Sequence, residues 1–150
     1  MDIKYTGSHA PIYSHINDAG ADLLSAEPEL TIEPGYRQLV STGVSIALPD
    51  GYGAFIMPRS GLAAKHGITV LNSPGVVDAG YRGELKVLLI NHGPNPYTVA
   101  PEDKIAQLVI MPVVHAQFVR VMYLDESERG EGGFGSTGYA HAVDSNTDQG

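Results

Sequence analysis

The 150-residue sequence contains no cysteine, no tryptophan and no long run of apolar residues. Without cysteine the chain can form neither disulfide bonds nor thiolate zinc sites. Its six histidines are scattered without HxH or HxxxH spacing, so the local sequence predicts no histidine metal site. No apolar stretch reaches membrane-spanning length, and the N-terminal MDIKYTGSHAP lacks the basic and then apolar layout of a signal peptide. These absences predict a cytoplasmic protein with no membrane partner.

Positive charge is also scarce. Nine Lys and Arg stand against 17 Asp and Glu, which gives a formal net charge of −8. A nucleic-acid-binding surface needs a basic footprint, so this composition argues against nucleic acid as a partner. A phosphorylated small molecule is compatible with it, because a few Arg side chains, backbone amides and a metal ion can hold one.

Glycine and proline are frequent, with 18 and 10 residues spread along the chain. Between them lie short β-favouring runs, and many short strands at near-regular spacing predict an all-β sandwich or barrel. One short helix is predicted over Ser60–His66, rich in small residues and ended by Gly67. The predicted strands are residues 30–33, 36–41, 44–48, 53–57, 68–71, 85–90, 97–99, 104–111 and 117–121.

The central segment, residues 68–91, reads ITVLNSPGVVDAGYRGELKVLLIN. Two β-rich runs flank a middle section rich in Gly and Pro, which predicts two strands joined by a shaped hairpin. A plain hairpin does not require Asp78, Tyr81 and Arg82 in its turn. A carboxylate, a phenol and a guanidinium on a loop held by strands are typical of a binding or catalytic loop. On this segment alone, a solvated hairpin tip explains them equally well.

From residue 125 onward the sequence is polar and glycine-rich, which predicts a core over residues 1–124 and an arm over residues 125–150. Within the arm, RGEGGFGSTG suits phosphate binding, because glycines let N–H groups converge and hydroxyls add donors. The spacing from Gly130 to Gly135 is that of a P-loop, but Ser136 stands where that motif requires lysine. The flanking strand and helix are missing too, so we predict a phosphate-binding tail without a P-loop fold.

Three further segments carry candidate chemistry. AGADL places Asp22 beside a glycine at the entry to a strand, and EDKIAQL places Gln107 on a strand. PRSGLA places Arg59 and Ser60 at the start of the short helix, where free N–H groups favour an anion. Taken singly, Asp22 is explained as a turn or cap residue, Ser60 as a helix N-cap and Gln107 as a solvent-facing residue.

Together and in this order, AGADL, PRSGLA, GVVDAGYRGE, EDKIAQL and RGEGGFGSTG resemble the five motifs of the homotrimeric dUTPase family, the deoxyuridine triphosphate nucleotidohydrolases. The resemblance spans residues 19–138. It implies an all-β, jelly-roll-like β-barrel with one short helix and a flexible C-terminal arm. It further implies three copies around an axis, with active sites between subunits and each arm closing over a neighbouring subunit's site.

The activity implied by the resemblance is hydrolysis of dUTP to dUMP and pyrophosphate, which keeps uracil out of DNA and supplies dUMP for thymidylate synthesis. The sequence departs from the family pattern at Glu102, where glycine is usual. Because glutamate does not adopt positive φ cheaply, we expect this turn to differ slightly, without loss of activity.

The resemblance also implies roles for single residues. Asp78 is the expected general base, which orients and deprotonates the water that attacks the α-phosphorus. Asn72 is expected to pair with uracil, and Tyr81 to pack on the deoxyribose and exclude a 2′-hydroxyl. Mg²⁺ is the expected cofactor, held mainly by the triphosphate, with Asp22 in contact through water. Arg82 is ambiguous between bracing the hairpin and bracing a subunit interface.

The resemblance implies that Phe134 stacks over the uracil. The other expected substrate-binding residues fall into three groups. They are Arg59, Ser60, Gly61 and Gln107 at the phosphates, Gly75, Val77 and Lys86 in or beside the hairpin, and Arg129, Phe134, Gly135, Ser136 and Thr137 in the arm.

Two alternatives remain open. The related dCTP deaminases share the barrel, but deamination typically requires a glutamate in a different local motif, which this sequence lacks. A non-catalytic, nucleotide-binding regulatory trimer would keep the pocket and lose the base, whereas Asp78 is present.

Overall fold

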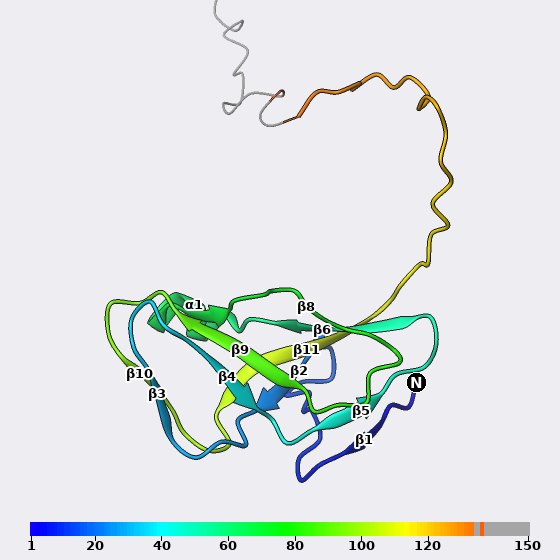
Figure 1. Ribbon diagram of the computed structural model, residues 1–150. Helices are drawn as coiled ribbons and strands as arrows, with labels where there is room; N and C mark the ends of the chain where they lie inside the picture. The colour runs from blue at the N-terminus through cyan, green and yellow to red at the C-terminus, as the bar shows by residue number, and fades with distance from the viewer. Residues whose placement is uncertain (134–135, 137–150) are drawn as a thin grey trace, which may run out of the picture. The chain divides into compact units, whose positions relative to one another are not determined.

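The computed structural model describes residues 1–133 and 136. By its internal contacts the chain divides into two units, Met1–His115 and Ala116–Gly150 (Figure 1). The predicted boundary between residues 124 and 125 stays a prediction. All strands and the helix of the described residues lie in the first unit: β1 (Lys4–Thr6), β2 (Gly20–Leu24), β3 (Leu30–Ile32), β4 (Arg37–Ser41), β5 (Ser45–Ala47), β6 (Tyr52–Met57), α1 (Ser60–His66), β7 (Ile68–Val70), β8 (Gly75–Val77), β9 (Lys86–Asn91), β10 (Tyr97–Val99) and β11 (Lys104–Pro112).

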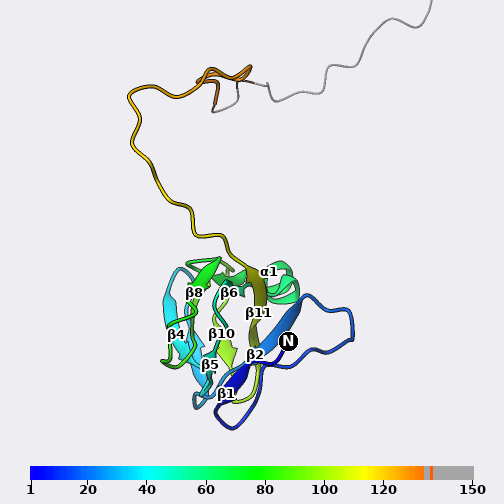
Figure 2. The ribbon, with the colours of Figure 1, turned by 90° about the vertical axis from the view of Figure 1, so that its right-hand side faces the viewer.

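The strands pair in antiparallel fashion in four sheets. The largest has the order β2-β11-β6-β8 and the next β4-β9-β7, while β1-β5 and β3-β10 form two-stranded pairs. Figure 2 shows β2 and β11 on one side of the first unit and β4 on the other. Both larger sheets contribute to one buried core, for example Leu23 and Leu108 from the first sheet and Val40 and Leu89 from the second. The prediction of an all-β fold with one short helix is confirmed.

The short helix α1 has the predicted bounds. It ends at Gly67, whose φ of 70° is left-handed and whose N–H bonds back to the carbonyls of the last turn. At its other end the N-cap is Arg59 in an extended conformation, without a side-chain cap bond, so Ser60 is the first helical residue and not the cap. No helix in the described part of the chain is both long and apolar enough to cross a membrane.

The two β-rich runs of the central segment pair as predicted, since β7 and β9 are antiparallel with Val70 opposite Leu89. Their connection is not a simple turn. Gly75–Val77 forms β8, a strand that the sequence did not predict, and β8 pairs with β6 in the other large sheet. The chain therefore crosses between the two sheets and back, and residues 78–85 bridge them. This wide connection leaves room for a hollow that a tight hairpin would close.

Other sequence predictions need correction. The strand predicted over residues 117–121 was wrong, because this β-favouring run has no strand partner among the described residues. A strand requires a neighbour to satisfy its backbone groups. Strand β1 was missed because KYT is polar, short and exposed. The strand predicted over residues 97–99 has its predicted bounds, and the other predicted strands are present with slightly different ends.

The turn at Glu102 also differs from expectation. Glu102 has a φ of 65° and is the one non-glycine residue with positive φ in the described ranges. The prediction that glutamate would alter this turn was wrong, because the glutamate itself adopts the left-handed conformation. Its N–H donates to the Ser25 carbonyl at 2.8 Å, and Asp103 Oδ2 accepts the Ala100 N–H at 2.8 Å. These bonds compensate a conformational cost of about 1 kcal/mol.

Candidate functional site

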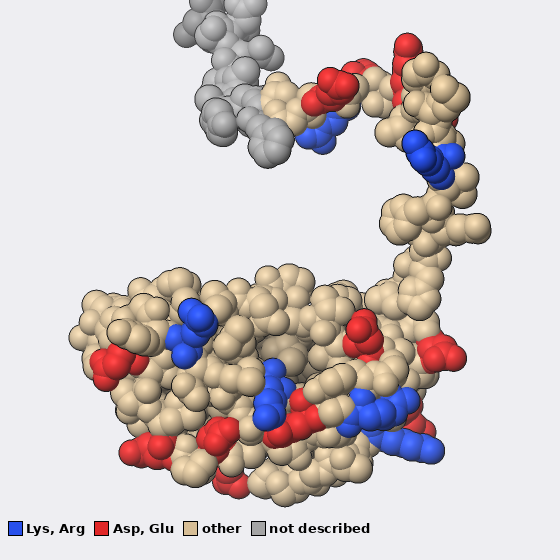
Figure 3. Space-filling model, viewed as in Figure 1, with Lys and Arg blue, Asp and Glu red and all other residues tan. Residues whose placement is uncertain are grey.

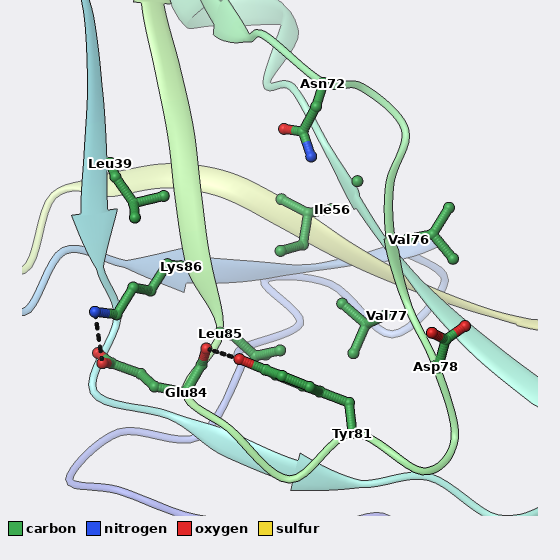
Figure 4. Close-up of a pocket in the computed structure, with 11 residues that line it drawn as sticks. Leu39, Ile56, Asn72, Val76, Val77, Asp78, Tyr81, Glu84, Leu85 and Lys86 are labelled. Atoms are coloured by element: carbon green, nitrogen blue, oxygen red, sulfur yellow. Dashed lines mark hydrogen bonds and ion pairs between the residues drawn. The ribbon is translucent and has the colours of Figure 1, made fainter.

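The first candidate site is a hollow of about 330 Å³ beside β8 and β9, here called the hairpin hollow (Figure 4). Asn72 projects its carboxamide at one end, and Tyr81 and Glu84 form the other (Figure 4). An amide, apolar walls and an aromatic ring suit a flat ligand with one polar edge. The predicted site residues on its walls are Asn72, Gly75, Val77, Asp78, Tyr81 and Lys86, and Leu39, Ile56, Val76, Glu84 and Leu85 complete it.

Asp78 follows β8 directly and lies on the rim of the hairpin hollow. Its side chain is exposed, and its carboxylate makes no hydrogen bond or ion pair with any residue that the structure describes. Its backbone carbonyl accepts the Tyr81 N–H at 3.0 Å, which fixes the turn that carries it. Its oxygens are therefore available to a ligand or a water molecule.

Tyr81 is held in place by its own loop. Its hydroxyl donates to the Glu84 carbonyl at 3.0 Å. A Cβ on Gly83 would collide with the ring, so glycine is required there for the ring to lie against the backbone. On the same wall, Lys86 Nζ lies 3.7 Å from Glu84 Oε2, so its ammonium is turned toward a carboxylate of the loop.

The second candidate site is a cleft of about 550 Å³ beside α1, here called the anion cleft. It contains the predicted residues Asp22, Arg59, Ser60, Gly61 and Gln107. The guanidinium, the ammonium of Lys65 and the Gln107 amide give it the donors that bind an anion. Ser14, His15, Asp18, Ala19, Gly20, Leu62, Lys65 and His66 also line it.

Asp22 organises the charges of the anion cleft. Its Oδ1 lies 3.0 Å from Arg59 Nε, and its Oδ2 lies 2.7 Å from Lys104 Nζ and accepts a bond from Ser14 Oγ at 3.1 Å. Arg59 Nη1 also donates to the Lys104 carbonyl at 3.0 Å, so the guanidinium is fixed from two directions. Burial raises the pKa of Asp22, but the Lys104 hydrogen bond, the Arg59 charge and the Ser14 hydrogen bond together lower it below its ordinary value.

Gln107 is positioned by a close approach of β2. Its Nε2 donates to the Pro58 carbonyl at 2.8 Å, directly before Arg59. A Cβ on Gly20 would collide with the Gln107 side chain, so the glycine of AGADL leaves the space that Gln107 fills. Gly20 of AGADL and Gln107 of EDKIAQL therefore pack directly against each other, although their motifs are far apart in the sequence.

No group of three or more His, Cys, Asp or Glu that could hold a metal occurs in the described ranges. Asp22 is the carboxylate expected to contact Mg²⁺ through water. Its two oxygens are already contacted by three donors, from Arg59, Lys104 and Ser14. A resident ion coordinated directly by Asp22 does not fit this donor set. On the face of the first unit in Figure 3, basic and acidic side chains are interspersed and form no single patch.

The arm residues belong to the second unit, and the structure describes some of them. Arg129 Nε donates to the Gly132 carbonyl at 2.9 Å, and the Ser136 N–H donates to the Gly133 carbonyl at 3.1 Å. These bonds form local turns in the glycine-rich sequence. The other predicted arm residues, Phe134, Gly135 and Thr137, lie outside the described residues.

The predicted site residues of the first unit therefore fall into two cavities that share no lining residue. Sequence reasoning missed Glu84, Lys104 and Ser14. Glu84 and Lys104 stood inside the quoted motifs, where a charged residue next to a predicted site residue was the available signal. Ser14 gave no signal, because an isolated β-bridge between Ile12 and Asp22 is what brings its segment to Asp22.

The chain is similar to known proteins over most of its length. The dUTPase family model matches residues 6–138. The deoxyuridine 5′-triphosphate nucleotidohydrolase of Leifsonia xyli subsp. xyli is 56% identical over 140 residues, 93% of this chain and 91% of that protein. That of Thermobifida fusca is 60% identical over 134 residues, 89% and 74% of the two chains. The structure of the Staphylococcus bacteriophage 80alpha dUTPase with dUPNHPP superposes with a TM-score of 0.85 at 28% identity, covering 92% of this chain and 99% of that one.

Proposed function

Because this chain belongs to the dUTPase family, we propose that its two cavities bind the two halves of dUTP. The chain has the jelly-roll-like fold of that family and hydrolyses dUTP to dUMP and pyrophosphate. The identities of 56% and 60% to proteins named for this reaction support the activity. Its place in the cytoplasm and its assembly as a homotrimer are part of the proposal.

The hairpin hollow binds the deoxyuridine half. The Asn72 carboxamide offers a donor and an acceptor to the polar edge of uracil. Cytosine carries an amino group where uracil has a carbonyl, so a donor would face a donor. A Cβ on Gly75 would lie 3.3 Å from both Asn72 Nδ2 and Ile56 Cβ, so glycine keeps the base pocket open. Tyr81 closes the other end against the deoxyribose and leaves no space for a 2′-hydroxyl.

The anion cleft binds the triphosphate half. Arg59 offers a guanidinium that Asp22 and the Lys104 carbonyl hold in one orientation, which suits charge-assisted bonds to phosphate oxygens. Ser60 and Gly61 supply backbone and hydroxyl donors, and Gln107 an amide. From the arm, Arg129, Ser136 and Thr137 add donors, Gly135 allows close approach and Phe134 stacks over the uracil.

Mg²⁺ enters as part of the substrate. It binds the triphosphate oxygens, keeps several of its waters and offsets the negative charge of the triphosphate. Because Arg59, Lys104 and Ser14 already contact the Asp22 carboxylate, Asp22 reaches this ion only through water.

Asp78 acts as the general base. Its carboxylate accepts a proton from a water molecule, whose oxygen forms a bond to the α-phosphorus as the bond to the leaving pyrophosphate oxygen breaks. Tyr81 on the deoxyribose and Asp78 on the same rim place the water beside the 5′ end of the sugar. Positioning and charge stabilisation provide the remaining acceleration.

One observation carries this proposal: the groups suited to the nucleoside and those suited to the phosphates lie in separate cavities of one chain. We propose that the two cavities act together across subunits of the homotrimer that the family resemblance implies, with the hairpin hollow of one copy facing the anion cleft of another. Head-to-tail contacts of this kind close into a ring when the rotation between neighbouring copies closes, as it does in a trimer.

Mixing two variants that are each expected to be severely impaired tests the proposal. Asp78→Asn and Arg59→Ala are each purified, then unfolded and refolded together in equal amounts. If the two residues act across subunits, random assortment restores about a quarter of the sites. Separately refolded variants are the control. Activity no higher than that control would mean that both residues act within one chain, and would contradict the composite site.

No observation favours the dCTP deaminase alternative, since the matching family and both relatives are named for dUTP hydrolysis. Ammonia release from dCTP is the measurement that would reveal deamination.

A further inference from the structure

The role of Arg82 follows from its hydrogen bonds. Arg82 Nη1 donates to the Ala79 carbonyl at 2.6 Å and to the Tyr81 carbonyl at 2.8 Å. One charged nitrogen therefore closes the turn that joins Asp78 to Tyr81. Two charge-assisted bonds from one group hold both peptide units in one orientation, although the side chain itself is exposed.

Glu84 fastens the other end of the same loop. Its Oε1 accepts the Gly43 N–H at 2.8 Å, which ties the loop to the turn between β4 and β5. Its Oε2 lies 3.7 Å from Lys86 Nζ. Its backbone carbonyl accepts a hydrogen bond from the Tyr81 hydroxyl at 3.0 Å, so the position of the tyrosine ring depends on the position of Glu84 (Figure 4).

Arg82 and Glu84 can affect the reaction without contacting the substrate, because they hold the loop that carries Asp78 and Tyr81. Asp78 and Tyr81 lie on one short loop, and displacement of that loop moves both the carboxylate and the ring. A displacement of about 1 Å can cost about a hundredfold in rate where geometry is critical. The packing of Gly83 against the ring leaves Tyr81 little freedom to compensate.

We infer that Arg82 and Glu84 are positioning residues that set the Tyr81 ring against the deoxyribose and thereby set the discrimination between dUTP and UTP. Arg82 fixes the turn before the ring, and Glu84 fixes the carbonyl that holds its hydroxyl. This inference rests on the proposed role of the hairpin hollow and adds two residues to it.

The test compares kcat/KM for dUTP and UTP in the full-length protein. Glu84→Ala removes the acceptor for Gly43, whereas Glu84→Gln keeps an acceptor oxygen at that place. Arg82→Ala removes both carbonyl bonds, whereas Arg82→Lys keeps a charged donor. Arg37→Ala is the matched control, because Arg37 is exposed and lines neither cavity. Thermal unfolding and the oligomeric state are measured for each variant.

Both alanine variants are expected to lower the dUTP-to-UTP ratio about tenfold, because a displaced ring no longer excludes the 2′-hydroxyl. The glutamine and lysine variants are expected to recover most of that ratio, and the control to keep all of it. A dUTP-to-UTP ratio unchanged in both alanine variants would overturn the inference, whether both kcat/KM values stay the same or fall equally. If wild-type protein itself accepts UTP as readily as dUTP, the proposed role of the hollow fails first, and the two failures are thus distinguishable.

Discussion

Asp22 Oδ1 lies 3.0 Å from Arg59 Nε, and this ion pair joins the AGADL and PRSGLA motifs across the anion cleft. The geometry of this ion pair explains why the anion cleft, whose donors suit a polyanion, also contains the buried carboxylate of Asp22. Lys104 and Arg59 offset the charge of Asp22, so we expect it not to repel the phosphates of the proposed substrate. It orients the guanidinium that we expect to bind them.

Replacing Asp22 is therefore expected to act through Arg59. Asp22→Asn should raise KM for dUTP about tenfold, since a hydrogen bond between charged groups contributes about 1.5 kcal/mol. It should also lower the free energy of unfolding by about 2 kcal/mol, less than for a fully buried pair because Arg59 and Lys104 are partly exposed. Steady-state kinetics and urea unfolding measure the two effects. An unchanged KM would show that Arg59 needs no such support.

The lowered pKa of Asp22 also predicts how stability depends on pH. A carboxyl group with a folded pKa below its ordinary value of 3.8 stabilises the folded state fully above that pH. The contribution is lost as the pH falls through the folded pKa. Between about pH 5 and pH 3, the free energy of unfolding should thus fall less steeply in Asp22→Asn than in the wild type. Parallel slopes would argue against this assignment.

Gly20 and Gln107 offer a test of packing in the anion cleft. Gly20→Ala places a Cβ where the Gln107 side chain lies and should displace it. The expected result is a rise in KM equal to that of Gln107→Ala, about fivefold, since one neutral hydrogen bond contributes about 1 kcal/mol. The double variant should be no worse than either single variant, because both remove the same contact. Additive effects would mean that the two residues act independently.

Glu102→Gly should stabilise the protein. Glycine adopts the observed φ of 65° without the steric cost that glutamate bears, although it adds entropy to the unfolded chain. The net expectation is a gain of about 0.5–1 kcal/mol in the free energy of unfolding, with kcat and KM unchanged. A loss of stability would show that the contact between Glu102 and His9, 3.4 Å apart, outweighs the backbone strain.

The sequence predicted those parts of the fold whose signals are local. The bounds of α1 follow from small residues and a terminal Gly67, and the pairing of β7 with β9 follows from two β-branched runs. Strand β8 could not be predicted, because GVV is short and is a strand only through its pairing with β6. The run 117–121 failed for the converse reason: it has the pattern of a strand but no partner among the described residues.

For the candidate site too, the sequence predicted the features that depend on local motifs and not those that depend on the tertiary fold. The motifs predicted Asp78, Tyr81, Arg59 and Gln107 as site residues, and the structure places each of them on the lining of a cavity. They did not indicate that these residues occupy two cavities, because that depends on how the sheets cross. The ion pairs of Asp22 with Arg59 and Lys104 likewise join residues far apart in the sequence, and no spacing rule predicts them.

The most direct test of the central claim is pyrophosphate release from dUTP with Mg²⁺ by the wild type and by Asp78→Asn. Binding of a non-hydrolysable dUTP analogue is measured as well. Pyrophosphate release is also measured with dCTP, dTTP and UTP, each as the sole substrate. We expect rapid release from dUTP alone, and in the variant a loss of kcat of about a hundredfold or more, with analogue binding retained. Asp78→Asn protein that turns over dUTP at the wild-type rate would contradict the assignment of Asp78 as the base.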